Sequence, residues 1–206
     1  MFKIQNKIPK QIILACSGGV DSMSALDFLR RKHDVIVLHI NHGTPQANQM
    51  ESCVADYCAK HSVSRCLIQE IETVHCPTGK SAEEHWRDER YKLIDAASKE
   101  MGIPAVTIHH LNDCVETWIW SSMHGTPKII PYQRNSVIRP FRLTPKHTFI
   151  NWAKRHNVPY CEDDSNQDTN YTRNYIRHVC MPHIKKINPG IAKTVAKKIL
   201  ACEDTE

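Results

Sequence analysis

The segment from residue 16 to residue 22, Cys-Ser-Gly-Gly-Val-Asp-Ser, has the residue types that bind an anion. It lies between an apolar run and an amphipathic pattern, which predict a strand, a tight turn and a helix. The N–H groups of such a turn and the positive end of the helix dipole point at the bound ligand. Gly18 and Gly19 allow the backbone to approach that ligand closely. The hydroxyl groups of Ser17 and Ser22 can donate further hydrogen bonds, so phosphate is the expected ligand.

Asp21 lies in the same turn, where its carboxylate would repel a polyphosphate. A Mg²⁺ ion bridging Asp21 and the phosphate oxygens would remove this repulsion, so Asp21 is a candidate metal ligand. The turn matches neither G-x-x-x-x-G-K-S/T nor G-x-G-x-x-G. The alternative is a strand-to-helix turn in which serine and aspartate only cap the helix.

A second candidate group is a pair of carboxylates, Asp113 and Glu116, three residues apart on an expected helix. Their side chains face the same way, so they could hold a cationic amine, and one could accept a proton from it. The alternative is an acidic first turn that favours the helix dipole. His109 and His110 are expected to end the preceding strand. Because consecutive strand residues point to opposite faces, only one of these histidines should reach a ligand there.

Two pairs of arginines are also candidates. Arg87 or Arg90 could stabilise a leaving phosphate, since guanidinium is a rigid donor of several hydrogen bonds. The competing interpretation is an exposed face with ion pairs, to which Glu83 would contribute. Arg173 and Arg177 lie four residues apart on a short expected helix that follows a very polar loop.

The elements that would position these residues alternate between strand and helix. Strands are expected at 11–16, 34–40, 63–71 and 104–110, and helices at 22–31, 46–61, 81–101 and 112–123. This order predicts an α/β fold with a Rossmann-like parallel sheet of about five strands flanked by helices. A proline-rich loop with at most one short strand near 137–139 follows, and then helices at 145–156, 171–180 and 189–201. We therefore expect a catalytic domain at 1–143 and a helical extension at 144–206, continuous with it.

The composition of the chain excludes several classes of protein. The 206 residues are 41% hydrophobic and 24% charged, without an apolar run that could span a membrane or serve as a signal peptide, so a cytoplasmic protein is expected. Nine cysteines without a C-x-x-C pair argue against a disulfide framework and a zinc site. The tail from Lys185 to Lys198 holds five lysines and no acid, which favours a polyanionic partner such as RNA or, equally, a solvated basic helix.

Residues 17–22, SGGVDS, resemble the pyrophosphate loop (PP-loop) of ATP pyrophosphatases, which release pyrophosphate from ATP while adenylating a substrate. Other stretches narrow the resemblance: LHINHG (38–43), EEHWRDERY (83–91), HHLNDCVETWIW (109–120), IRPF (138–141) and EDDSNQDTNYTRNYIRHVCMP (162–182). Together they resemble the N-terminal catalytic domain of the tRNA(Ile)-lysidine synthetase family over nearly the whole chain.

This resemblance implies a reaction on the wobble cytidine of tRNA(Ile) with a CAU anticodon. ATP, with Mg²⁺, would adenylate the carbonyl oxygen of the base with loss of pyrophosphate. Free L-lysine would then displace AMP at the same carbon to give lysidine, which pairs with A rather than G.

The resemblance also implies roles for individual residues. Those expected to bind ATP are Ser17, Gly18, Gly19, Asp21, Ser22, His39 and Asn41. Those expected to be catalytic are Asp21, Asp113, Glu116, His110, Arg87 and Arg173. Those expected to bind substrate are His110, Asp113, Glu116, Arg173, Asn174 and Arg177. Asn174 could instead act as a local helix cap.

The chain departs from the family pattern in two motifs and in length. Thr44-Pro45-Gln46 stands where Leu-Arg is usual after NHG, and Trp86 replaces a small residue. The family's usual C-terminal tRNA-binding domains are expected to be absent, so a homodimer or a helper protein could assist tRNA binding.

Two alternatives to lysidine synthesis stay open. One is a PP-loop tRNA thiolase, for which Cys76 and Cys114 would be the relevant thiols. The other is a noncatalytic ATP- and RNA-binding remnant.

Overall fold

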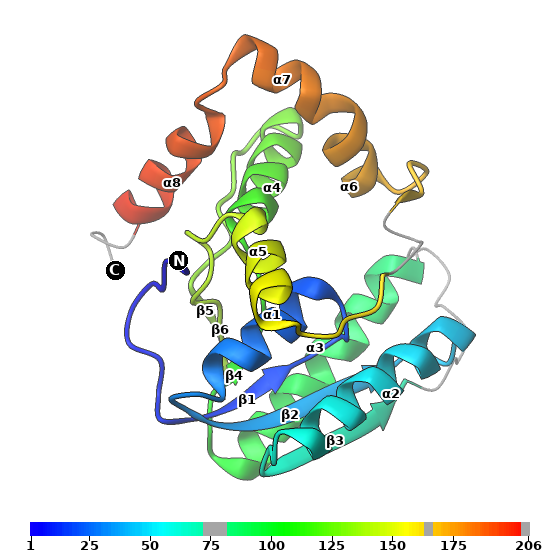
Figure 1. Cartoon of the computed structure of the whole chain (residues 1–206). Coiled ribbons are helices and arrows are strands. Elements are labelled where there is room, and N and C mark those ends of the chain that lie inside the picture. The colour runs from blue at the N-terminus through cyan, green and yellow to red at the C-terminus, as the bar shows by residue number, and fades with distance from the viewer. Residues whose placement is uncertain (72–81, 163–166, 203–206) are drawn as a thin grey trace.

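The protein is described by a computed structural model that covers residues 1–71, 82–162 and 167–202 (Figure 1). Within these ranges a six-stranded sheet has the strand order β3-β2-β1-β4-β6-β5. The strands are β1 (Gln11–Ala15), β2 (Asp34–Asn41), β3 (Arg65–Glu70), β4 (Ala105–Val106), β5 (Gln133–Arg134) and β6 (Val137–Ile138). All neighbouring strands are parallel except β5 and β6, which are antiparallel. The predicted α/β class is confirmed.

Helices cover both faces of the sheet, as a parallel sheet requires. On one face α1 (Val20–Leu29), α2 (Pro45–Lys60) and α5 (Lys146–His156) pack around Leu14 and Val37. On the other face α3 (Ala82–Met101) packs against the sheet near Ile13 and Ile36. The central strands are therefore buried from both sides, which explains why β1 and β2 are continuous apolar runs rather than alternating ones.

The loops that could bind a ligand lie together at one edge of the sheet. β1 pairs with β4 in register Leu14 to Val106, so the chain leaves both strands at the same level. The turn after β1 enters α1, and the segment after β4 enters α4 (Leu111–Met123). Ligands bind at this carboxyl edge in open α/β sheets, beside the point where the strand order reverses.

The fourth strand is shorter than predicted. It was expected to run from 104 to 110 and to end in both histidines, but it comprises only Ala105–Val106. It pairs only with Ile13 and Leu14 of β1 on one side and with the two-residue strand β6 on the other, so each ladder has two residue pairs. His110 is instead the N-cap of α4, with φ −99° and ψ 173°. The placement of the two histidines in a strand was therefore wrong.

The proline-rich segment contains two short strands instead of at most one. β5 and β6 form a hairpin in which Asn135 adopts the left-handed conformation, with φ +53°. Asparagine is one of the few residues that tolerate this conformation, and it is a frequent hairpin-turn residue. The sheet consequently has six strands in the described ranges, where about five were expected.

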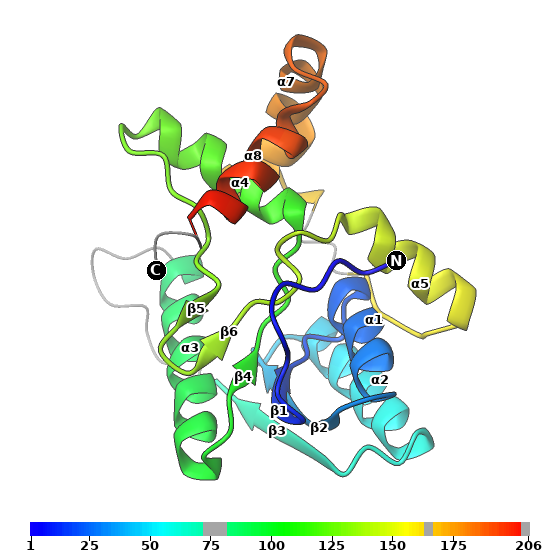
Figure 2. The same cartoon turned by 90° about the vertical axis from the view of Figure 1, so that its left-hand side faces the viewer.

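The C-terminal part contains α6 (Thr172–Tyr175), a π-helical segment (Ile176–Cys180), α7 (Met181–Ile187) and α8 (Ile191–Ala201). The helix expected at 171–180 thus changes pitch halfway, and α7 was not predicted. α8 buries Val195 and Ile199 against Cys114 and Val115 of α4. Figure 2 shows α4, α7 and α8 together above the sheet. None of the helices in the described ranges is long and apolar enough to cross a membrane.

The buried carboxylate of Asp27 joins the three helices on one face of the sheet. It accepts hydrogen bonds from Tyr57 Oη (2.6 Å) in α2 and from Trp152 Nε1 (2.9 Å) in α5. It also forms ion pairs with Arg30 (2.6 Å), the C-cap of α1, and with the next residue, Arg31 (2.8 Å). Burial alone would raise the pKa of Asp27, but these donors outweigh it and lower the pKa to about 2.

Candidate active site

The turn between β1 and α1 is shaped by its two glycines in different ways. Gly18 has φ +88°, and a Cβ atom there would lie 3.0 Å from both Cβ and the carbonyl oxygen of Met50 in α2. Gly19 is the N-cap of α1 with φ −76°, and no side chain caps the helix. Gly18 therefore lets the turn lie against α2, while the first turn of α1 keeps its amide groups open to a ligand.

Two hydroxyl groups line this helix N-terminus, as predicted. Ser17 Oγ lies 3.2 Å from Ser22 Oγ, and Ser22 donates to the carbonyl oxygen of Gly19 at 3.0 Å. Ser17 is exposed and Ser22 is buried. Ser22 therefore fixes the turn, and Ser17 presents a hydroxyl to solvent at the point where an anion would bind.

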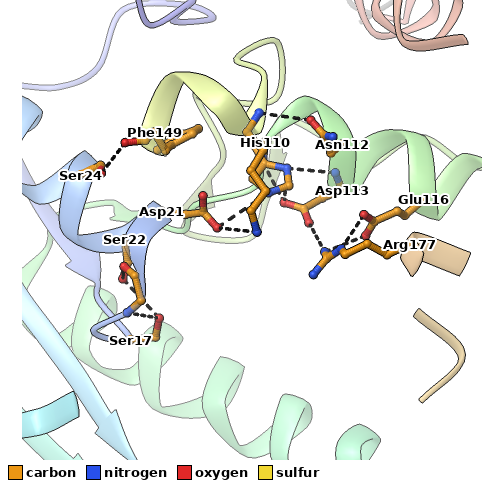
Figure 3. A network of polar contacts seen from close by, with 12 residues as sticks. Ser17, Asp21, Ser22, Ser24, His110, Asn112, Asp113, Glu116, Phe149 and Arg177 are labelled. Atoms are coloured by element: carbon orange, nitrogen blue, oxygen red, sulfur yellow. Dashed lines mark hydrogen bonds and ion pairs between the residues drawn. The ribbon is translucent and has the colours of Figure 1, made fainter. Parts of the chain in front are cut away.

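Asp21 lies at the centre of a polar network that connects α1 with α4 and α5 (Figure 3). Its Oδ2 atom is 3.8 Å from His110 Nε2 and 3.7 Å from Lys146 Nζ. Its Oδ1 atom is buried and has no hydrogen-bond partner in the described ranges. A carboxylate oxygen of this kind suits Mg²⁺, a cation that prefers oxygen ligands.

A cation at Asp21 would need ligands from outside the protein. Among the described residues no group of three or more His, Cys, Asp or Glu side chains could hold a metal ion. Mg²⁺ commonly takes one or two carboxylates together with substrate phosphates and water. The residues present thus fit a metal that arrives with a phosphate ligand.

Lys146 is a site residue that sequence reasoning missed. It is the first residue of α5, and its backbone N–H donates to Asn112 Oδ1 in α4 at 3.1 Å. This bond fixes the start of α5 beside α4 and directs the lysine side chain towards Asp21. The sequence did predict a carboxylate at Asp21 that needs a cationic partner. Nothing in the local pattern, however, identifies Lys146 as that partner, because the two residues are far apart in the chain.

His110 and Asp113 form a reciprocal cap at the start of α4. The backbone N–H of His110 donates to Asp113 Oδ2 at 2.8 Å, and that of Asp113 donates to His110 Nδ1 at 3.1 Å. Because Nδ1 accepts a hydrogen bond, the neutral imidazole carries its proton on Nε2, the atom nearest Asp21. His110 is only 2% exposed, so the ring is fixed between the two carboxylates.

His109 has a different environment from its neighbour. Its Nδ1 atom lies 3.3 Å from Thr107 Oγ1. Burial, which disfavours the charged form, lowers the pKa of His109 to about 3. His109 is therefore neutral near pH 7, and it is His110 that contacts both Asp21 and Asp113.

Asp113 and Glu116 are brought together with Arg173 and Arg177, and the four side chains form one cluster. Arg177 Nε lies 2.8 Å from Glu116 Oε1, and Arg173 Nη2 lies 3.1 Å from Asp113 Oδ1. Arg173 Nε also lies 3.2 Å from Glu116 Oε2. Two carboxylates and two guanidinium groups balance in charge, so the cluster is electrically neutral without a ligand.

The electrostatics of this cluster fix its protonation states. Burial alone would raise the pKa of Asp113, but His110 and Arg173 outweigh it and lower the pKa to about 2. For Arg173 burial acts to lower the pKa, and the attraction of Asp113 and Glu116 raises it overall. Asp113 is therefore an anion at every physiological pH and suits binding of a cation better than uptake of a proton.

His39 and Asn41 lie at the end of β2, where they were predicted. His39 Nδ1 donates to the carbonyl oxygen of Cys16 at 2.9 Å, and burial lowers the pKa of the ring. Its Nε2 atom is buried without a partner among the described residues and is free to accept a hydrogen bond. Asn41 donates to Asn48 at 2.9 Å and to Glu51 at 2.7 Å, so its amide organises the β2–α2 loop.

Two further predicted residues, Asn174 and Arg87, lie on α6 and α3. Asn174 is buried and donates to the carbonyl oxygen of Asp168 at 2.9 Å, which ties α6 to the preceding loop, whereas the N-cap of α6 is Tyr171 and no side chain caps that helix. Arg87 is exposed on α3 and lines a cavity of about 360 Å³ together with Arg134 and Asn135. No hydrogen bond or ion pair joins Arg87 to Asp113 or Glu116 in the described part of the chain.

The two departures from the family motifs lie at the start of α2 and on α3. Thr44 caps α2 by accepting a hydrogen bond from Ala47 N at 3.1 Å, and Pro45 occupies the first turn, so the loop ends in a helix start. Trp86 is exposed on α3, with its ring centroid 6.1 Å from that of His42. The side chain of Glu83, the proposed partner of Arg87, lies outside the described residues, as does Cys76.

The chain is similar in sequence to known proteins of one family. Residues 2–184 match the sequence profile of the PP-loop domain family. The chain is 28% identical to the tRNA(Ile)-lysidine synthase of Thermotoga maritima, covering 92% of this chain and 49% of that protein. It is 33% identical to the enzyme of the same name from Lactiplantibacillus plantarum, covering 91% of this chain and 45% of that protein. The chain thus spans about half the length of the curated relatives it matches.

Two solved structures share the fold at low sequence identity. The U34-tRNA thiolase NcsA from Methanococcus maripaludis has a TM-score of 0.76 and 13% identity, covering 95% of this chain and 73% of that one. The NH3-dependent NAD synthetase from Campylobacter jejuni has a TM-score of 0.55 and 15% identity, covering 95% and 86%. At this identity the similarity establishes the fold and nothing further.

Proposed function

The chain belongs to the PP-loop domain family, and from that membership we propose that it uses ATP to convert the wobble cytidine of tRNA(Ile) into lysidine. The resemblance to tRNA(Ile)-lysidine synthetases that the motifs indicate is confirmed by the relatives. The observation that carries the proposal is one polar network that links the phosphate-binding turn, through Asp21 and His110, to the pair Asp113 and Glu116. Such a network would bring ATP bound at the turn close to a cation bound at the carboxylate pair.

ATP would bind with its phosphates on the first turn of α1. Gly18 lets the turn lie against α2, no side chain caps the first turn of α1, and Ser17 has an exposed hydroxyl that can donate to the phosphates. His39 Nε2 could accept a hydrogen bond from another part of the nucleotide. Mg²⁺ bound at Asp21 would neutralise phosphate charge when present. Lys146, which is 3.7 Å from Asp21, would stabilise the charge that develops as pyrophosphate leaves.

Lysine would bind through its ammonium group at Asp113 and Glu116. Both side chains are mostly buried, with 12% and 5% of their surface exposed, so a cation there is shielded from water. Asp113, with a pKa of about 2, would hold the cation. The attacking amine must lose a proton before it displaces AMP, and Glu116 and Asp21 are the remaining carboxylates in reach of that role.

The tRNA would contact the helical part of the chain. Between residues 169 and 202 the sequence contains arginine and lysine but no aspartate or glutamate. A surface of this kind attracts the phosphate backbone independently of sequence. We propose the division into 1–143 and 144–206, with the second part joined to the first through α5 on α1 and α8 on α4.

The proposal is tested by incubating the purified protein with ATP, Mg²⁺, radiolabelled lysine and unmodified tRNA(Ile) bearing CAU. Label should enter acid-insoluble material at the wobble cytidine, and D21N should abolish it. Pyrophosphate release on bulk tRNA without lysine incorporation would contradict lysidine formation and favour the thiolase alternative. ATP binding without pyrophosphate release would favour a noncatalytic binder.

Cys114 does not favour the thiolase alternative. Its side chain is fully buried between α4 and α8, and burial raises the pKa of the thiol to about 12. A protonated, buried thiol is a poor nucleophile and a poor sulfur carrier. We therefore expect C114A to retain lysine incorporation, whereas a thiolase that uses this thiol would lose sulfur transfer.

A further inference from the structure

The face of α4 that carries the two carboxylates continues into an exposed aromatic pair. Trp120 lies four residues after Glu116 and seven after Asp113, so all three project from the same side of the helix. His124 follows four residues later on that side. Trp120 is thus one helical turn beyond the carboxylate that Arg177 contacts.

The aromatic pair is ordered but open to solvent. The rings of Trp120 and His124 are 4.6 Å apart with an interplanar angle of 36°, and His124 Nδ1 donates to the Trp120 carbonyl oxygen at 2.7 Å. Trp120 is 42% exposed. Trp118, on another side of α4, instead packs with the buried cluster under Lys198. Burial in the core therefore accounts for a large aromatic side chain at position 118 but not at position 120.

The charges of α4 and its neighbours suit a polyanion with an unpaired base. The only acids of α4, Asp113 and Glu116, are both neutralised by arginines. α8, which packs against the Trp118 side of α4, carries lysines and no acid. Single-stranded RNA is held by such a combination of a cationic surface with aromatic rings on which bases stack.

We propose that Trp120, supported by His124, is a stacking platform for the adenine that follows the wobble cytidine in the CAU anticodon. The cytidine must lie at the ATP and lysine sites, and the next base lies about one stacking distance further along the strand. A purine offers the larger ring surface to indole. This inference rests on the proposed function and adds a residue that selects the anticodon loop beside the reacting base.

The test uses the anticodon stem-loop of the tRNA with 2-aminopurine in place of that adenine. W120F keeps an aromatic ring, and W120L keeps apolar volume without one. Binding of the stem-loop should quench the 2-aminopurine fluorescence with the wild type and W120F. W120L should lack the quenching and bind roughly 5- to 100-fold more weakly, the range for loss of one stacked base. The affinity for ATP should be the same in all three proteins.

Three results separate the failure of this inference from that of the proposed function. Equal quenching and equal affinity for W120L, in a protein that incorporates lysine, would overturn the platform and leave lysidine formation intact. A wild-type protein that neither binds the stem-loop nor incorporates lysine would overturn both. Loss of self-association in W120L, with stem-loop binding unchanged, would assign the surface to a second copy of the chain and so overturn the platform.

Discussion

Arg177 holds Glu116 with two hydrogen bonds, from Nε to Oε1 at 2.8 Å and from Nη2 to Oε2 at 2.9 Å. This bidentate geometry is the strongest that an arginine and a carboxylate adopt. The same carboxylate is proposed to receive the ammonium group of lysine. Lysine must therefore displace Arg177 from Glu116, and phosphate groups of ATP are the anions to which the guanidinium can move.

The first prediction is that bound ATP increases the affinity of the protein for lysine. A nonhydrolysable ATP analogue should tighten lysine binding to the wild type about fivefold or more, a usual size for coupling between sites. R177Q should bind lysine without the analogue as tightly as the wild type binds it with the analogue. R177K, which keeps the charge but not the bidentate geometry, should be intermediate. Calorimetric titration of lysine measures all three, and equal lysine affinity of the wild type with and without the analogue would refute the coupling.

The second prediction separates the two glycines of the turn. G18A should lower the free energy of unfolding by about 2 kcal/mol, because an alanine is strained at this positive φ. The added methyl group would also press against Met50. G19A is the matched control for stability, since its φ is −76° and the nearest atom to an added Cβ is 3.6 Å away. Urea unfolding measures the difference, and equal stability of the two variants would show that the left-handed turn is not required.

The third prediction concerns Lys146. K146M should slow pyrophosphate release by about a hundredfold to a thousandfold, the loss expected when one group that stabilises developing charge is removed. K146R should retain most of the rate. The thermal melting curve of K146M should match that of the wild type, because the lysine side chain is partly exposed. An unchanged rate of pyrophosphate release in K146M would exclude Lys146 from the chemistry.

The fourth prediction concerns stability and pH. The pKa of Asp27 is about 2 in the folded protein, below its ordinary value of 3.8, so the folded state binds a proton less readily than the unfolded chain. The carboxylate therefore contributes about 2 kcal/mol of stability above about pH 4, which is lost as the pH falls towards about 2. D27N should lower the free energy of unfolding at pH 7 by about 3 kcal/mol, because it breaks a buried ionic network. The free energy of unfolding of D27N should also fall less between pH 5 and pH 2 than that of the wild type. An equal fall in the two proteins would contradict this role of Asp27.

Local signals in the sequence predicted the core of the fold correctly. The apolar runs of β1 and β2 and the amphipathic patterns of α3 and α4 are clear because each element is buried on one or both faces. The turn with Gly18 and Gly19 was likewise predictable, since a glycine pair between a strand and a helix has few other uses. Residues within one motif, such as Asp113 and Glu116, were grouped correctly because helical spacing fixes their geometry.

Features that depend on contacts between distant segments could not be predicted in this way. β4 is short, with two residue pairs to β1 and two to β6, and local sequence does not reveal the extent of this pairing. Lys146 reaches Asp21 only because Asn112 anchors the start of α5. The pairing of Arg173 and Arg177 with the carboxylates of α4 likewise depends on how α6 and the π-helical segment pack.

The most direct test of the central claim is the fate of labelled lysine in a reaction with ATP, Mg²⁺ and tRNA(Ile) carrying CAU, compared between the wild type and E116Q. We predict that the wild type places the label on the wobble cytidine. E116Q should release pyrophosphate in the presence of tRNA but incorporate lysine at least about a hundredfold more slowly, the lower end of the range for loss of a proton-transfer group. Equal incorporation by E116Q, or label at another nucleotide, would contradict the assignment of the carboxylate pair to lysine.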